Sequence, residues 1–305
     1  MSNQLSKKQA AFQAKRLNRI KQDRKRILVP NSGFHVQEAY KTLRTNVNFA
    51  LADTEGSKVL MVTSSLQGEG KSLTALNLSI SLAQTDKKVL LIDGDMRRPR
   101  LARLLNLSAP AGLSNLLMDF SLLSVALIND AEHGIDVIFA GDIPPNPAEL
   151  LGSGRMQKLM EQMRARYDYI IIDSPPVDLV VDAAVLSPHC DGVLFVVRVD
   201  QSERGAVLHA IEQLEYVNAK VVGFVLNGVN TDVDGAYGKY RYRKYGRYRY
   251  SKTGSYGYRS GYGYGNGYGY GYGYGYGYGY GYGYGYGSSG QHQEEALEQQ
   301  EEKED

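Results

Sequence analysis

The sequence predicts an α/β fold in which a mostly parallel sheet is flanked by helices. Two observations support this prediction: short apolar runs alternate with longer stretches of helical periodicity, and each short run is apolar throughout instead of alternating. Strands that are apolar on both sides are typical of a parallel sheet with both faces covered. Because ligand sites in such folds lie beyond the carboxyl ends of the strands, we expect the functional residues just after the apolar runs.

The expected elements follow one another in a regular order. The first helix has apolar residues at helical spacing, and its exposed face would carry Glu38, Lys41 and Arg44. Short apolar runs mark the strands, and the longer periodic stretches between them mark further helices. The expected helices are 36–51, 72–84, 149–166 and 207–217, and the expected strands are 59–63, 89–92, 135–139, 169–172, 193–197 and 221–226.

Composition divides the 305 residues into four segments. The first 26 residues carry nine Lys or Arg side chains against Asp23 alone, which indicates a basic arm. The tail consists almost wholly of Tyr, Gly and basic residues before it becomes acidic. We expect the arm and the tail to be disordered, and the tail has too few aliphatic residues to bury a core. The predicted boundaries are 1–34 for the arm, 35–236 for the globular domain, 237–290 for the tyrosine-glycine tail and 291–305 for the acidic end.

The sequence also indicates a compartment. No stretch approaches the roughly 18 consecutive apolar residues that span a bilayer, and the polar N-terminus lacks the apolar core of a signal peptide. A cytoplasmic location is therefore expected. The single cysteine, Cys190, excludes an internal disulfide, and we interpret it as a packed residue. The basic arm could dock on anionic lipid or on nucleic acid, or simply be solvated.

A phosphate-binding loop, or P-loop, follows the first expected strand. Residues 65–72 read Ser-Leu-Gln-Gly-Glu-Gly-Lys-Ser and run directly into a helix, with Ser65 in place of the usual first glycine. Glycines let backbone N–H groups close around phosphates, and the helix N-terminus adds its positive dipole end. The lysine can reach the β- and γ-phosphates, and the following serine can ligate Mg²⁺. We therefore expect nucleotide to be bound by Gly68, Glu69, Gly70, Lys71, Ser72 and Leu73.

Three carboxylates follow two other expected strands. Asp93 and Asp95 come directly after the second strand, and Asp173 follows the strand at 169–172. Each has a simpler explanation, because Asp-Gly-Asp often forms a plain turn and Asp173 or its neighbour Ser174 could cap a helix. Their convergence around one P-loop is harder to explain by chance. The three carboxylates together predict a site for ATP and Mg²⁺.

These motifs together resemble those of the bacterial tyrosine kinases, a P-loop NTPase branch related to the MinD and ParA ATPases. The resemblance rests on the P-loop, on Asp93-x-Asp95-x-Arg97, called Walker A′ in that family, and on Asp173-x-x-Pro176; it covers residues 36 to about 230. The extra lysine that marks the MinD branch is absent from the P-loop. The resemblance implies that Asp93 activates the acceptor hydroxyl, while Ser72, Asp95 and Asp173 hold Mg²⁺. The catalytic residues would be Lys71, Asp93, Asp95 and Asp173.

Two further assignments come from the same resemblance. The family's oligomerisation helix carries Glu-x-x-Arg-x-x-Arg, which corresponds here to Glu38, Lys41 and Arg44. Lysine keeps the charge but loses the bidentate fork of arginine, so a ring built on this helix would be weaker; a solvated helix face is the alternative. Asn227 corresponds to the position that recognises the purine, although an asparagine after a strand is more often a turn residue.

Tyrosine is concentrated in the tail. Twenty of the 24 tyrosines lie between Tyr237 and Tyr286. A sticky low-complexity segment and a nucleic-acid-binding surface are alternatives, but stacking could use any aromatic ring and the tail has neither Trp nor Phe. The phenolic hydroxyl is thus the selected feature, and we expect no nucleic-acid partner. The predicted phosphoacceptors are Tyr237, Tyr240, Tyr242, Tyr245, Tyr248, Tyr250, Tyr256 and Tyr258.

The predicted function is ATP-dependent autophosphorylation in trans on the tail tyrosines. Since no membrane span is evident, the chain resembles the split form of the family. That form implies a transmembrane polysaccharide co-polymerase-type activator, a homo-oligomeric ring, a cognate phosphotyrosine phosphatase and a peripheral place at the inner face of the cell membrane. The process controlled would be capsular or extracellular polysaccharide synthesis and export. A ParA- or MinD-like positioning ATPase and a non-catalytic assembly scaffold are the alternatives; the tail argues against the first and the intact carboxylate set against the second.

Overall fold

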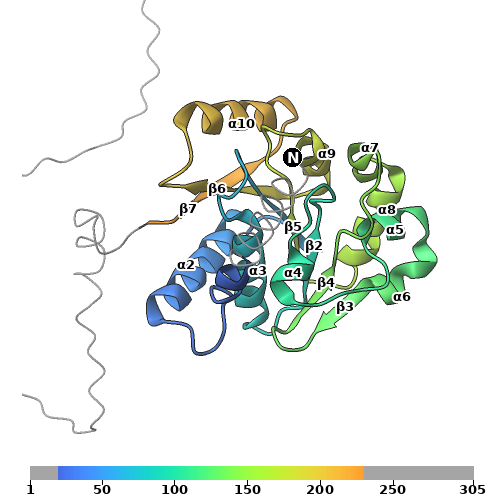
Figure 1. The fold of residues 1–305 in the computed structure, drawn as a ribbon, viewed down its shortest axis with the longest axis horizontal. Coiled ribbons are helices and arrows are strands. Elements are labelled where there is room, and N and C mark those ends of the chain that lie inside the picture. The colour runs from blue at the N-terminus through green and yellow to red at the C-terminus, as the bar shows by residue number, and fades with distance from the viewer. Residues whose placement is uncertain (1–19, 230–305) are drawn as a thin grey trace, which may run out of the picture. The chain divides into compact units, whose positions relative to one another are not determined.

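The structure is a computed structural model and describes residues 20–229 (Figure 1). The first part of the basic arm, all predicted phosphoacceptor tyrosines and the acidic end lie outside the described residues. The described residues contain the predicted P-loop, the three carboxylates and Asn227. The site can therefore be examined in full, whereas the assignments on the tail stay predictions.

A seven-stranded sheet lies at the centre of the domain, in the order β3-β4-β2-β5-β1-β6-β7. Every neighbouring pair is parallel except β3 and β4, which are antiparallel. The predicted mostly parallel sheet is therefore confirmed, with one antiparallel edge strand that the sequence pattern did not reveal. The strands are β1 Lys58–Ser64, β2 Val89–Asp93, β3 Leu127–Asp130, β4 Ile135–Ile138, β5 Tyr169–Asp173, β6 Gly192–Arg198 and β7 Val221–Asn227.

Helices cover both faces of the sheet, and alternate residues of each central strand pack on opposite sides. In β1, Leu60 and Val62 belong to the core beneath α2, α3 and α4, whereas Val59 and Met61 belong to the core beneath α5 to α10. No helix in residues 20–229 is both long and apolar enough to cross a membrane. The helices are α2 Phe34–Ala50, α3 Lys71–Ala83, α4 Leu101–Leu105, α5 Leu113–Met118, α6 Leu123–Ala126, α7 Pro147–Leu151, α8 Gly154–Arg164, α9 Asp182–Leu186 and α10 Arg204–Tyr216, with short 3-10 helices at Phe120–Leu122 and Ser187–His189.

The expectation that every strand is buried on both faces fails at β7. The central strands β1, β2 and β5 are buried almost throughout. In β7, by contrast, Phe224 and Leu226 are 55% and 63% exposed. The physical reason is position, because β7 is an edge strand that pairs only with β6 and has no helix over these two side chains among the described residues.

The single long helix expected at 149–166 is in fact two helices, α7 and α8. The break lies at Gly152 and Ser153. Ser153 has an extended backbone, and its side chain accepts a hydrogen bond from the backbone N–H of Met156, which caps the start of α8. The apolar spacing continues across this break, so periodicity alone could not locate it.

The end of the predicted basic arm packs on the domain. Ile27 and Leu28 are buried, and the backbone N–H of Leu28 donates to Oδ1 of Asn77 in α3 at 2.8 Å. The amide of Asn77 in turn donates to the carbonyl oxygen of Arg26 at 2.9 Å. One asparagine thus fastens the segment before α2 to the helix that follows the P-loop.

Candidate active site

The loop between β1 and α3 has the backbone conformation that a phosphate site requires. Gly68 and Gly70 have φ angles of 89° and 99°, in the left-handed region that favours glycine. A Cβ atom on Gly70 would lie 2.0 Å from the Nδ2 of Asn227, so a side chain there would displace Asn227. Gly70 also forms the N-cap of α3 without a side-chain capping bond. The first N–H groups of α3 are consequently available to an anion.

The side chain of Glu69 holds this loop from the inside. Its carboxylate is fully buried and accepts hydrogen bonds from the backbone N–H of Leu66 at 2.7 Å and from the hydroxyls of Ser65 and Ser202. The serine that replaces the usual first glycine therefore has a structural role as a partner of Glu69. Because the carboxylate is bonded to the loop's own donors, any contact of Glu69 with nucleotide would come from its backbone.

Two segments distant in sequence support the loop from outside. Gln201, in the connection between β6 and α10, donates to the carbonyl oxygen of Gln67 at 2.7 Å. Asn227, the last residue of β7, donates to the carbonyl oxygen of Glu69 at 2.7 Å, and its Oδ1 accepts the N–H of Gly228 at 2.9 Å. Asn227 thus lies beside the P-loop, as its predicted role in nucleotide binding requires, with both polar atoms of its amide bonded within the protein.

Replacing Glu69 with alanine is expected to weaken ATP binding about tenfold and to lower the melting temperature. Alanine leaves the partly buried N–H of Leu66 without an acceptor, and the loss of such a hydrogen bond costs about 1–3 kcal/mol. Glutamine at the same position is the matched control: its carbonyl can serve Leu66 and the two hydroxyls can rotate to accept from its amide, so a smaller loss is expected. Nucleotide titration and thermal unfolding measure both effects. Unchanged ATP affinity in the alanine variant would show that the carboxylate does not shape the loop.

The carboxylates meet at the carboxyl edge of the sheet. Asp93 ends β2 and Asp173 ends β5, and the register places these two residues side by side on neighbouring parallel strands. Asp95 lies two residues further along, and its Oδ2 is 3.4 Å from the Nζ of Lys71. All four side chains are buried or nearly so. The structure thus brings together the residues that the sequence assigned to catalysis.

Asp173 provides a test of whether the site fits Mg²⁺. Both of its carboxylate oxygens are buried, and neither accepts a hydrogen bond from the described residues, which also rules out a helix-capping role within them. Burial raises the pKa of Asp173, while the charge of Lys71 acts in the opposite direction. A buried carboxylate without hydrogen bonds is costly unless a cation accompanies it.

The arrangement is typical of Mg²⁺ shared with a nucleotide. Within residues 20–229 no three His, Cys, Asp or Glu side chains form a ready-made metal cage. Mg²⁺ prefers one or two carboxylates together with phosphate oxygens and water, so such a cage is not needed. Asp173, Asp95 and the hydroxyl of Ser72 are the residues that would hold it, and the ion would neutralise charge on the β- and γ-phosphates.

Asp93 organises the loop that follows β2. One carboxylate oxygen accepts the N–H of Asp95 at 3.2 Å, and the other accepts the N–H groups of Arg100 at 3.2 Å and Leu101 at 3.1 Å. Burial, and then the charge of Asp173, raise the pKa of Asp93. This direction suits a group that takes up a proton near neutral pH. The same side chain therefore fixes the Walker A′ loop and has an increased affinity for a proton.

A second interaction that fixes the Walker A′ loop, besides the hydrogen bonds of Asp93, was not apparent from the sequence. The guanidinium of Arg97 makes two hydrogen bonds, of 2.8 and 2.9 Å, to the fully buried carboxylate of Asp182 in the first turn of α9. The backbone also approaches closely here, because the N–H of Gly94 donates to the carbonyl oxygen of Asp173 at 2.8 Å and a Cβ on Gly94 would lie 3.0 Å from that oxygen. The Walker A′ loop is therefore joined to the segment after β5.

The residues assigned to oligomerisation divide into two groups. Glu38 and Lys41 form an ion pair of 2.8 Å on the surface of α2, with side chains 41% and 48% exposed. Arg44 instead donates to the carbonyl oxygen of Ser81 in α3. Glu38 and Lys41 are thus available to a neighbouring copy, whereas Arg44 stabilises its own domain.

Leu73 is one of the expected nucleotide-binding residues. Its half-buried side chain packs against the core under α3, so only its backbone is left for a ligand.

Comparison with known proteins shows the family. A family model described as an AAA domain matches residues 57–221, more than half of the chain. The tyrosine-protein kinase YwqD of Bacillus subtilis is 40% identical over 203 residues, which cover 67% of this chain and 85% of YwqD. The chain belongs to the bacterial tyrosine kinases. The matched region of this kinase contains the P-loop and the three carboxylates and ends before Asn227.

Further relatives and solved structures agree. The tyrosine-protein kinase CpsD of Streptococcus agalactiae is 37% identical over 210 residues, 68% of this kinase and 90% of CpsD. The kinase domain of the Escherichia coli tyrosine kinase ETK is 34% identical with a TM-score of 0.62, covering 73% of this kinase and 80% of that structure. A cobyrinic acid a,c-diamide synthase from Mycobacterium smegmatis, 19% identical with a TM-score of 0.51 over 63% of this kinase and 82% of that chain, shares the fold alone.

Proposed function

We propose that this bacterial tyrosine kinase transfers the γ-phosphate of ATP to tail tyrosines of a second copy and thereby regulates capsular or extracellular polysaccharide synthesis and export. The observation that carries the proposal is the convergence of Lys71, Asp95 and Asp173 at a P-loop in a chain whose tail holds 20 of its 24 tyrosines. The part that concerns polysaccharide rests on the resemblance to the family.

The proposed reaction is a single in-line displacement. The phenolic oxygen of a tyrosine forms a bond to the γ-phosphorus while the bond from that phosphorus to the bridging oxygen breaks, and ADP leaves. Asp93 takes the phenolic proton, for which its raised pKa is favourable. Lys71 moves from Asp95 to the phosphates, and the N–H groups of the P-loop bind them. Little else is required, because phosphoryl transfer depends mainly on alignment and charge stabilisation.

The length of the tail supports transfer between copies. The tail is attached beyond β7, whose last residue touches the P-loop. A glycine-rich chain of this length has an r.m.s. span of roughly 40 Å, comparable to the diameter of the domain. The segment 237–290 carries eight basic residues and no acid, which favours its approach to a site lined by carboxylates and phosphates.

Mixing two variants tests transfer in trans. A full-length Lys71→Met protein supplies a tail without activity, and a protein ending at residue 236 supplies activity without a tail. We expect phosphotyrosine on the tail of the inactive protein in the mixture, at a rate that rises with the concentration of the active one, as measured by mass spectrometry. The inactive protein alone is the control. An unphosphorylated tail in the mixture, with the short protein shown to bind ATP, would refute transfer between copies.

The proposed setting includes partners. The kinase would act at the inner face of the cell membrane, bound to a transmembrane polysaccharide co-polymerase-type activator, assembled as a ring, and reset by a phosphotyrosine phosphatase. The tyrosine-protein kinase etk of Escherichia coli matches this chain over 29% of its own length. In that relative the kinase region is one part of a longer protein.

A further inference from the structure

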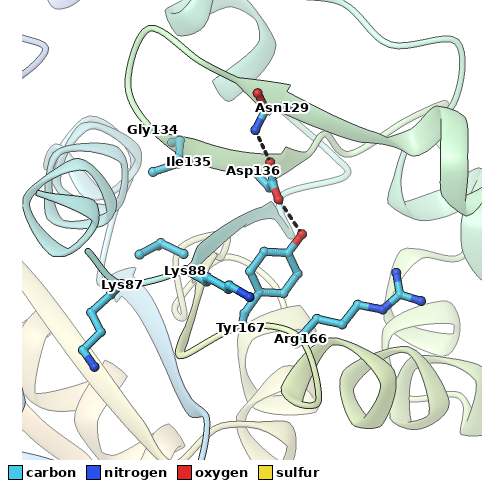
Figure 2. Close-up of a pocket in the computed structure, with 9 residues that line it drawn as sticks. Lys87, Lys88, Asn129, Gly134, Ile135, Asp136, Arg166 and Tyr167 are labelled. Atoms are coloured by element: carbon cyan, nitrogen blue, oxygen red, sulfur yellow. Dashed lines mark hydrogen bonds between the residues drawn. The ribbon is translucent and has the colours of Figure 1, made fainter. Parts of the chain in front are cut away.

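A hollow of about 440 Å³ lies at the amino-terminal edge of the sheet, opposite the active site. It is formed where β2 and β4 begin and where the chain approaches β5, whereas Asp93 and Asp173 lie at the other ends of β2 and β5. Lys87, Lys88 and Arg166 contribute three cations to its wall, and Tyr167 contributes a buried ring. In Figure 2 the amino group of Lys88 is directed toward this ring, whereas the side chains of Lys87 and Arg166 extend away from it. The catalytic machinery described above uses none of these residues.

The charges of the hollow are unbalanced. Among the described residues, none of the three cations has an ion-pair partner. The carboxylate in the wall, Asp136, is already satisfied: one oxygen accepts from the amide of Asn129 and the other from the hydroxyl of Tyr167, each at 2.7 Å (Figure 2). The nearby carboxylate of Asp168 accepts the backbone N–H of Lys88 at 2.8 Å. The three cationic side chains are therefore available to bind an external anion.

We propose that this hollow binds an acidic peptide, and that its ligand is the segment 291–305 of a second copy of the chain. The segment carries seven acidic residues against Lys303, a charge opposite to that of the hollow. The acidic segment has no part in the proposed phosphate transfer, so docking would give it a function.

The consequence for catalysis rests on the proposed function. A docked acidic end would hold the adjacent tyrosines of one copy near the kinase domain of another. Exposed charge pairs are individually weak, but a linked segment gains from an effective concentration that reaches the mM range. Docking of modest affinity is therefore sufficient to favour the tail over unrelated tyrosines.

Peptide binding without ATP tests the proposal independently of kinase activity. The probe is a fluorescent synthetic peptide of residues 291–305. The protein is the full-length chain in which the seven acids of its own segment are replaced by Gln or Asn, so that its own end does not compete. We expect saturable binding that weakens with added salt, falls about tenfold in the triple variant Lys87→Gln, Lys88→Gln, Arg166→Gln, and is retained when the same positions become Arg, Arg and Lys.

A matched triple variant separates a site from general attraction. Lys158→Gln, Arg204→Gln and Lys220→Gln also remove three exposed positive charges but lie outside the hollow. This control should bind the peptide as the parent does, and thermal unfolding should show that both triples are folded. Equal loss in the two triples, or the absence of saturable binding to the parent, would overturn the proposal. A kinase that fails to phosphorylate tails in trans but still binds the peptide would contradict only the proposed function.

Discussion

A Lys71→Met protein is expected to lose phosphate transfer by about 10²–10³-fold, because methionine cannot hold the developing charge on the phosphates. The structure adds a cost in stability. Lys71 pairs with Asp95 at 3.4 Å, with side chains only 8% and 7% exposed. Removing one partner of such a buried pair costs about 3–5 kcal/mol, since the other charge is left without compensation. Phosphotyrosine by mass spectrometry and the free energy of unfolding in denaturant measure the two effects.

A double variant separates those two effects. Lys71→Met with Asp95→Asn removes the orphaned charge, so it should recover part of the lost stability while remaining inactive. Recovery of activity in the double variant would show that Lys71 acts only through Asp95. Unchanged transfer in the single variant would remove the P-loop lysine from the mechanism.

Asp93→Asn is expected to bind ATP yet to lower transfer by about 10²–10⁴-fold, because an amide cannot take the phenolic proton. Its carbonyl oxygen can still accept the N–H groups of Arg100 and Leu101, so the Walker A′ loop should keep most of its shape. Nucleotide titration and single-turnover transfer provide the measurements. Loss of nucleotide binding at an otherwise folded site would instead identify Asp93 as a metal ligand.

Thermal unfolding of the same variant provides a control with a definite sign. In the parent protein the pKa of Asp93 is raised, so the folded state binds the proton more tightly than the unfolded state does. Stability from this group is therefore present at low pH and is lost as the pH rises through the raised pKa. The asparagine variant lacks this loss. Its melting temperature relative to the parent should be higher at pH 8 than at pH 5 when Mg²⁺ and nucleotide are left out.

The sheet and the ends of its strands could be predicted because they depend on local pattern. Runs such as those of β1, β2 and β5 are apolar on both sides, which only a covered parallel sheet accommodates. A polar residue directly after such a run must lie at the carboxyl edge, so Asp93 and Asp173 were expected to converge. The interpretation of Cys190 as a packed residue agrees with a thiol bonded to the carbonyl oxygen of Leu186 and a pKa raised by burial to about 12.

What the sequence could not predict depends on partners far along the chain. Asp182 is 85 residues from Arg97, and Ser202 is 133 residues from Glu69, so no local pattern connects either pair. The short strand β3 reads Leu-Ile-Asn-Asp and so has no continuous apolar run. Its residues are half-buried or exposed except at Asp130. The sequence of β7 is apolar, and this does not reveal whether a helix covers the strand. These features follow from which elements become neighbours, and only the folded chain shows that.

The hydrogen bond from Asn227 to the P-loop has a mechanical consequence. The chain beyond β7 is attached to the domain through this strand. The side chain of Asn227, the last residue of the strand, donates a hydrogen bond to the carbonyl oxygen of Glu69. Under the proposed transfer between copies, capture of the tail tyrosines by a neighbour would apply tension beside the nucleotide site of the molecule that carries the tail. Thermodynamic linkage makes this coupling reciprocal, so a nucleotide that reshapes the P-loop also moves the root of the tail. If transfer occurs between copies as proposed, the activity of each copy as a kinase would be coupled to its use as a substrate.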